Sequence, residues 1–325
     1  MTIAVILAIP DGLTIRDTGD YARIDLRDKR FQPIVDALQA GESAGVFAVQ
    51  LHGLEHYWPV ALMKSSDPTV RDWLLQEEFP FTEQLPPPLQ SRWVDASELP
   101  SLPLPLPALE NAVEEEAALF RECFGEPAKV AVPTTFIWDD NVEAAWAKQG
   151  IEIVITPGRR NSCRDEQGLP GCGRGVIHNL ERGNGVVYLV RDDYFEPEKG
   201  HTAATALAAL RRKKAQGRPC LLETHRANFL GVGTASALAE LDRLLALALA
   251  EFPDIRFMSS SELAAAMADS RNPLLARSFP SRIRYWLERV RDLSRFNKLA
   301  ELIGFLPLLR FLVRLPATGS REVNP

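Results

Sequence analysis

Two of the chain's five histidines stand close together in the stretch VQLHGLEHYW, residues 49–58. His52 ends an apolar run typical of a strand, and His56 follows four residues later, directly after the acid Glu55. At this spacing two imidazole rings can face one divalent ion, and neutral imidazole suits zinc and similar metals. The order differs from His-Glu-x-x-His, so a metallopeptidase helix is a poor match. Two surface histidines on a turn are the simpler alternative.

Other side chains that could do chemistry also follow apolar runs. His225 ends such a run in CLLETHRANF, and RDDYFEP contributes Arg191, Asp192 and Tyr194. Arg191 could hold Asp192 or a sugar hydroxyl, and Tyr194 could stack on a sugar ring. A solvated loop with an internal ion pair explains these residues equally well. In folds with parallel strands, chemistry lies on loops at the carboxyl ends of the strands, so the shared location favours a functional site.

Two further stretches have both a functional and a structural interpretation. Trp138 in IWDD could line the same cleft, whereas Asp139 or Asp140 more simply caps the helix that follows. The loop TPGRRNSCRDEQG, residues 156–168, carries three arginines that could meet an anionic sugar. Solvated charges are an equally good account of that loop.

Short apolar strands alternate with longer amphipathic helices along most of the chain. This alternation predicts βα repeats around a parallel sheet. The predicted strands lie within residues 3–9, 45–53, 128–133, 151–158, 185–197, 218–225 and 255–260. The predicted helices lie within residues 30–41, 68–79, 107–125, 141–150, 201–217, 235–252 and 261–269, the last of them capped by Ser260 or Ser261.

Two segments depart from this alternation. Residues 79–107 contain eight prolines, which exclude a regular helix or a central strand and indicate a functional loop or a linker. From about residue 271 the pattern is helical only, and residues 281–315 hold eight Lys or Arg against three Asp or Glu. We therefore expect a domain at 1–270, with the insert at 79–107, and a basic amphipathic tail at 271–325. The tail could pack on the domain or lie in a membrane interface.

The totals exclude several classes of protein. A formal net charge of −6 over 325 residues argues against a general nucleic-acid role. No apolar run is long enough to span a membrane, and the start of the chain lacks the basic segment of a signal peptide. Four scattered cysteines form no Cys-x-x-Cys pair. A Cys163–Cys172 disulfide could form, but the cytosolic composition argues against it.

The stretch HGLEH resembles the second motif of the polysaccharide deacetylase superfamily, which reads His, Ser or Thr, two variable residues, His. VAVPTTFIWDDNVEAAWAKQGIEIVI is similar to the third motif and the helix and strand after it. CLLETHRANF is similar to the closing motif, and IRFMSSSELAAAM to the final strand and helix. The resemblance covers roughly residues 3–269.

This resemblance implies a distorted (β/α) barrel of about seven parallel strands. It implies that His52 and His56 bind the metal and that His225 protonates the leaving amine. The family's first motif, a pair of aspartates that supplies the third ligand and the base, is not found. Asp11 in Pro-Asp-Gly is its nearest counterpart, and Lys129 stands where the family has an arginine. The barrel would then lack its first strand.

The expected function is therefore metal-dependent removal of acetyl groups from a carbohydrate such as an exopolysaccharide, with zinc as the metal. The alternative is a barrel without catalytic activity that binds glycan or organises polysaccharide assembly at a membrane surface. The expected partner is a carbohydrate, not a nucleic acid, with membrane-surface contact through residues 281–315. The expected location is cytoplasmic, at or near the inner face of the membrane.

Overall fold

The computed structural model describes residues 1–173 and 175–314, with the backbone alone at 294–297, 309–310 and 312–314. The chain divides into two compact units. Unit 1 consists of Met1–Arg191 and Phe257–Ala268. Unit 2 consists of Asp192–Arg256 and the chain from Asp269 onward.

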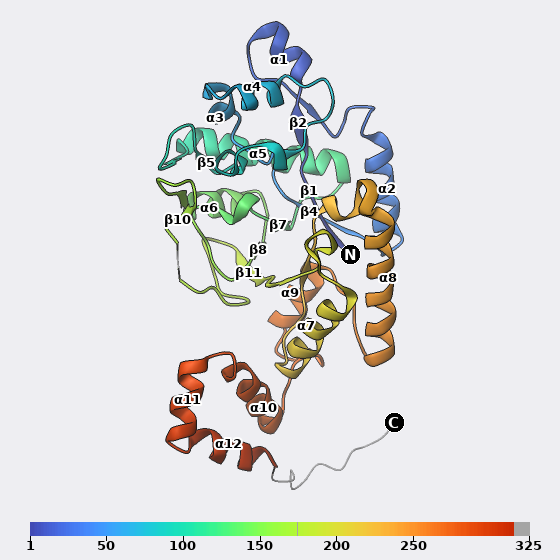
Figure 1. Cartoon of the computed structure of the whole chain (residues 1–325), viewed down its shortest axis with the longest axis vertical. Helices are drawn as coiled ribbons and strands as arrows, with labels where there is room; N and C mark the ends of the chain where they lie inside the picture. Colours follow the sequence, from blue (N-terminus) through green and yellow to red (C-terminus); the bar gives the residue numbers. More distant parts are fainter. Residues whose placement is uncertain (174, 315–325) are drawn as a thin grey trace. The chain divides into compact units, whose positions relative to one another are not determined.

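A parallel sheet forms the centre of unit 1, as Figure 1 shows. Its strands are, in spatial order, β1 (Thr2–Val5), β4 (Ala48–Leu51), β7 (Val130–Ala131), β8 (Ile153–Thr156) and β11 (Val187–Val190). Within this sheet, each strand lies beside the sheet strand that precedes it along the chain, as is typical of repeated βα units. The predicted α/β class with a parallel sheet and C-terminal helices is confirmed.

Helices and short connecting elements complete unit 1. The helices are α1 (Gly12–Thr18), α2 (Gln32–Ser43), α3 (Pro59–Lys64), α4 (Pro68–Leu74), α5 (Leu106–Phe124), α6 (Asp140–Lys148) and α9 (Ser260–Ala268). Single 3₁₀ turns occupy Thr82–Gln84, Pro87–Gln90 and Thr134–Phe136. Helix α5 ends at Gly125, which has a φ of 80°, and Asp139 caps α6 by accepting hydrogen bonds from the backbone N–H groups of Asn141 and Val142. Both helix ends were predicted from the sequence.

The first predicted strand, residues 3–9, is split in the structure. After β1 the chain leaves the sheet, and β2 (Ala8–Pro10) pairs antiparallel with β3 (Arg23–Asp25). Backbone N–H groups of Leu7 and Ala8 bond to the carbonyl of Leu54, and this contact bends the run away from β4. An apolar run predicts a strand but not its partner, so this break could not be predicted from the run alone.

The last predicted strand, residues 255–260, is irregular in the structure. Helix α9 after it has a reciprocal cap, in which the Ser259 hydroxyl accepts from the Glu262 backbone N–H and the Glu262 carboxylate accepts from the Ser259 N–H. The capping residue is therefore Ser259 and not Ser260 or Ser261, because Glu262 stands three residues after Ser259.

The proline-rich insert, residues 79–107, is ordered by short elements, as its composition predicted. It holds two 3₁₀ turns and the antiparallel pair of β5 (Val94–Asp95) and β6 (Leu102–Pro103). Its Trp93 packs edge-to-face on Trp146 of the core, with ring centroids 5.5 Å apart. The insert is thus packed against the rest of unit 1 through buried side chains.

A small hairpin of β9 (Cys163–Arg164) and β10 (Pro170–Gly171) is closed by a Cys163–Cys172 disulfide. The composition argued against this bond.

Unit 2 is mainly helical. It contains the parallel pair β12 (Asp193–Tyr194) and β13 (Leu222–Glu223), helices α7 (Ala203–Ala215), α8 (Thr234–Glu251), α10 (Phe279–Val290), α11 (Ser294–Leu302) and α12 (Phe305–Arg314), and 3₁₀ turns at Pro197–Lys199, Arg226–Phe229 and Gly231–Gly233. Helices α7 and α8 pack through Leu207, Leu244 and Phe252. Among the described residues, no helix combines the length and apolar character needed to cross a membrane.

Candidate active-site residues in the two units

The His52–His56 turn follows β4 at the carboxyl edge of the sheet in unit 1. The two rings lie 5.0 Å apart, centroid to centroid. Nδ1 of His52 donates to the backbone carbonyl of Val132 at 2.7 Å, and Nδ1 of His56 donates to that of Gln90 at 2.9 Å. A carbonyl can only accept, so in each neutral ring the proton sits on Nδ1 and the lone pair on Nε2. Metal-binding histidines are oriented by contacts of this kind.

A buried ionic network anchors the turn that carries His52 and His56. Glu55 is fully buried and accepts from Arg92 Nη1, from Arg23 Nη1 at 2.9 Å and from the Tyr21 hydroxyl at 3.1 Å. Glu116 accepts from the Leu54 backbone N–H at 3.1 Å. Glu55 is therefore an anchor for the turn between the histidines.

Burial also perturbs Glu116. Its carboxyl accepts from Trp146 Nε1 at 2.7 Å and lies 3.5 Å from Arg92 Nε. Loss of solvent raises the pKa of Glu116 to about 7, because the attraction of Arg92 and these hydrogen bonds only partly offset the desolvation.

The loop after β7 lies at the same edge of the sheet and has an unusual backbone. Thr135 and Phe136 have φ angles of 52° and 55°, a region that residues with side chains seldom adopt. The Thr134 hydroxyl accepts from the Arg92 backbone N–H at 3.1 Å, which ties this loop to the insert. Strain of this sort gathers at functional sites. The predicted sugar contact Arg191, after β11, places its guanidinium 5.9 Å from the centre of the Phe136 ring.

The third predicted ligand, Asp11, has another role. Its carboxylate caps α1, accepting from the backbone N–H of Thr14 at 3.2 Å and from the Thr14 hydroxyl at 2.7 Å. Within residues 1–173 and 175–314, no group of three His, Cys, Asp or Glu side chains is arranged to hold a metal ion. The predicted set of His52, His56 and Asp11 is therefore not formed, since Asp11 follows the strand that left the sheet.

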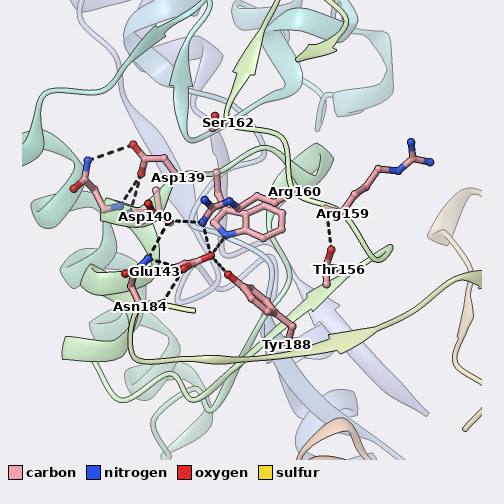
Figure 2. A network of polar contacts seen from close by, with 12 residues as sticks. Asp139, Asp140, Glu143, Thr156, Arg159, Arg160, Ser162, Asn184 and Tyr188 are labelled. Carbon is pink, nitrogen blue, oxygen red and sulfur yellow. Dashed lines mark hydrogen bonds and ion pairs between the residues drawn. The ribbon is translucent and has the colours of Figure 1, made fainter. Parts of the chain in front are cut away.

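Trp138 is a core residue and does not line a cleft. Its side chain has no exposed area, and its indole Nε1 donates to Glu143 at 2.8 Å. Figure 2 shows the network around Glu143, whose carboxylate also accepts from Tyr188, from Arg160 at 2.9 Å and from Asn184 at 3.0 Å. Burial tends to raise the pKa of Glu143, but these hydrogen bonds outweigh it and lower the pKa.

In the loop of residues 156–168, two of the three arginine side chains are buried within unit 1. Arg160 pairs with Glu143 and with Asp140 at 2.7 Å, as Figure 2 shows, and is 8% exposed. Arg164 donates to the Ser91 hydroxyl at 2.9 Å and is also buried. These two arginines hold loops of unit 1 together, so they are neither the solvated charges nor the exposed sugar contacts that the sequence suggested.

In unit 2, His225 stands between two buried carboxylates. Its Nδ1 lies 2.8 Å from Glu196 Oε1, and its Nε2 lies 3.4 Å from Glu223 Oε1. The imidazole is about half exposed, with 52% of the side-chain area open to solvent, whereas both carboxylates are nearly covered. Burial tends to raise the pKa of Glu196, but hydrogen bonds from Asn228 and His225 outweigh it and lower the pKa. Glu196 therefore remains ionised and orients the ring.

The sequence contained signals for both acids. Glu196 belongs to the quoted stretch RDDYFEP, and Glu223 precedes His225 by two residues, which places both side chains on one face of an extended segment. Glu143 had no such signal, because a glutamate in the first turns of a helix is ordinarily exposed.

The other predicted sugar contacts are in unit 2. Asp192 pairs with Lys213 and, at 3.4 Å, with Arg218. It lines a polar cavity of about 320 Å³ together with Arg212, Lys213, Gln216, Arg218 and Asp292. Tyr194 is 44% exposed, which suits contact with a ligand.

One comparison bears on the class of protein. Residues 95–194 match the model of glycosyl hydrolase family 57, and the matched stretch includes the Glu143 network and the loop after β7. The match supports a carbohydrate-processing hydrolase in general. It does not extend to the deacetylase superfamily that the histidine motifs resemble. No curated protein sequence matches the chain significantly.

Proposed function

We propose that this protein is a carbohydrate hydrolase in which His225, oriented by Glu196, transfers a proton to the leaving group. The observation that carries the proposal is the pairing of a half-exposed imidazole with an ionised, buried carboxylate. Glu196 fixes the orientation of the ring through Nδ1, and Nε2 lies on the side of Glu223. Proton transfer by a positioned histidine accelerates reactions by roughly 10²- to 10⁴-fold.

More specifically, we propose that the reaction is removal of an acetyl group from the carbohydrate. Water adds to the acetyl carbonyl, the bond from the acyl carbon to the sugar nitrogen or oxygen breaks, and the protonated His225 gives its proton to the departing atom, while the proton that water loses returns to His225 through solvent. The products are acetate and a free amine or hydroxyl. The order of the HGLEH and CLLETHRANF motifs supports this reaction, together with the carboxylate–histidine pair.

The second candidate is hydrolysis of a glycosidic bond. Two observations favour it: the match to glycosyl hydrolase family 57, and the two buried carboxylates, Glu196 and Glu223, that flank His225. Glycosidases commonly use a pair of carboxyl groups, one as acid and the other as nucleophile or base. The two reactions differ in their products, acetate in one case and a new reducing end in the other.

The test is to assay both products from acetylated and non-acetylated oligosaccharides. Acetate release that falls about 10²-fold or more in His225→Ala supports the deacetylase. New reducing ends with the same dependence support the glycosidase. His178→Ala is the control, because His178 is exposed in unit 1. Retained oligosaccharide binding without either product would contradict both reactions and favour a glycan-binding protein.

A divalent metal at His52 and His56 is part of the proposal for unit 1. The Nδ1 contacts, which place both lone pairs on Nε2, support it. The described residues do not complete a zinc ligand set, so no chemical step is assigned to the metal. About one ion per purified chain, lost in His52→Ala, is the expected result of elemental analysis. No ion in either protein, even after incubation with zinc, would contradict it.

A further inference from the structure

Helices α10, α11 and α12 pack on one another through a small cluster within unit 2. Val290, Ala300 and Leu306 are its buried members, with Trp286 and Leu287 against them. Trp286 meets Phe305 edge-to-face, with centroids 6.1 Å apart. Among the side chains that the structure describes, Ala300 of α11 and Leu306 of α12 belong to this cluster.

Other described apolar side chains in and between these two helices are exposed. We call this surface the apolar stripe; its members are Leu299, Leu302, Ile303, Leu308 and Phe311. Leu302 is 84% exposed and Ile303 68%. Leu299 and Leu302 of α11 are three residues apart, as are Leu308 and Phe311 of α12, so each pair shares a face of its helix, and Ile303 directly follows α11. Exposed apolar surface of this extent marks an interaction site.

The charge of the surrounding segment indicates what covers the stripe. Residues 281–315 carry eight Lys or Arg and three Asp or Glu, in a chain whose net charge is −6. Arg282, Arg284 and Lys298 are exposed basic residues of α10 and α11. A second copy would bring two basic segments together, which is unfavourable. Anionic lipid headgroups complement the charge, and the acyl boundary accepts the leucine and phenylalanine side chains.

We propose that helices α11 and α12 lie in the surface of an anionic membrane, with the apolar stripe inserted at the headgroup boundary. The chain lies on the bilayer and does not cross it through these helices, which are nine and ten residues long. Such binding needs both the apolar stripe and the basic residues, and the basic contribution weakens as salt screens it.

The test is sedimentation of the full chain with vesicles of phosphatidylcholine alone and of phosphatidylcholine mixed with phosphatidylglycerol. We expect binding to the mixed vesicles, weaker in high salt, and little binding to the neutral ones. The variant Leu302→Glu with Phe311→Glu should bind at least about tenfold more weakly, since burial of two large apolar side chains is lost. Leu249→Glu with Val232→Glu, which alters exposed apolar residues elsewhere in unit 2, should bind like the parent.

Three results would overturn the proposal. The parent chain could fail to bind mixed vesicles, or the stripe variant could bind as well as the control variant. The chain could also be a dimer that the stripe variant converts to a monomer, which would assign the stripe to a second copy. Circular dichroism of each variant establishes that it is folded before binding is compared.

Discussion

At the scale of single residues, the buried acids distinguish this molecule. Glu55, Glu116 and Glu143 have no exposed area, and each is held by arginine or by aromatic N–H and O–H groups. Charged groups are almost never buried unless they are paired. These carboxylates fix the loops at the carboxyl edge of the sheet.

Glu116 makes stability depend on pH in a defined direction. Its pKa is raised to about 7 in the folded chain, so the folded state keeps a proton that the unfolded state loses above its ordinary pKa. Glu116 therefore costs stability as pH rises from about 4.5 toward 7. Glu116→Gln mimics the protonated acid. Relative to that of the parent, the free energy of unfolding of this variant should rise by up to about 3 kcal/mol between pH 5 and pH 8. Urea unfolding of both proteins at pH 5 and pH 8 measures this change. If the two proteins differ in free energy of unfolding by the same amount at both pH values, the raised pKa of Glu116 is contradicted.

Glu196 is a positioning residue for His225, so its effect should appear in turnover. Glu196→Gln keeps the shape but loses the charge that orients the ring. We expect kcat to fall by about tenfold or more with KM nearly unchanged, measured on whichever substrate is active. Glu198→Gln, which changes an exposed acid in the 3₁₀ turn directly after Glu196, is the matched control. A rise in KM alone would assign Glu196 to substrate binding instead.

At the scale of elements, the turn after β4 depends on Gly53. Its φ is 112°, and an added Cβ would lie 3.0 Å from the Glu55 carbonyl oxygen and 3.3 Å from Arg92 Cδ. Gly53→Ala therefore introduces backbone strain and a close contact together.

We expect Gly53→Ala to lower the free energy of unfolding by about 2–4 kcal/mol. Gly45→Ala is the control, because Gly45 has a φ of 68° and open space around it. That control should cost only about 1 kcal/mol. Chemical denaturation of both variants measures the difference, and equal losses would show that the contact is relieved by movement of Arg92.

At the scale of the whole molecule, contacts within unit 2 run across the predicted boundary near residue 270. Arg289 of α10 donates to the backbone carbonyls of Gln216 at 2.8 Å and Gly217 at 3.1 Å. The Gln216 amide donates to Asp292 at 2.6 Å. Helix α10 and the residue Asp292 after it are therefore packed against the segment directly after α7.

Removal of residues 271–325 should lower the thermal midpoint of unit 2. Arg289→Ala should reproduce part of the loss, about 1–3 kcal/mol, because two backbone acceptors lose their partner. Arg282→Ala, at an exposed position of the same helix, should cost little. A truncated chain that melts at the same temperature as the full one would show that the tail is an independent domain.

Local patterns in the sequence predicted most elements of this protein. Helix α5 with Gly125, the Asp139 cap of α6, the non-regular insert and the parallel βα repeats all depend on neighbouring residues or on short periodicities. The placement of His52 and His56 at a strand end followed from the same reasoning. A strand end is a local feature, so its side chains can be found without knowledge of the fold.

Tertiary structure alone decided which distant groups meet. The pairing of β2 with β3 depends on a bend after β1. The buried state of Glu143 depends on Arg160 and Tyr188, which are 17 and 45 residues further along the chain. The pairing of His225 with Glu196 is of the same kind, because 29 residues separate them. Periodicity records which face of an element is buried, and it carries no information about which other element covers that face.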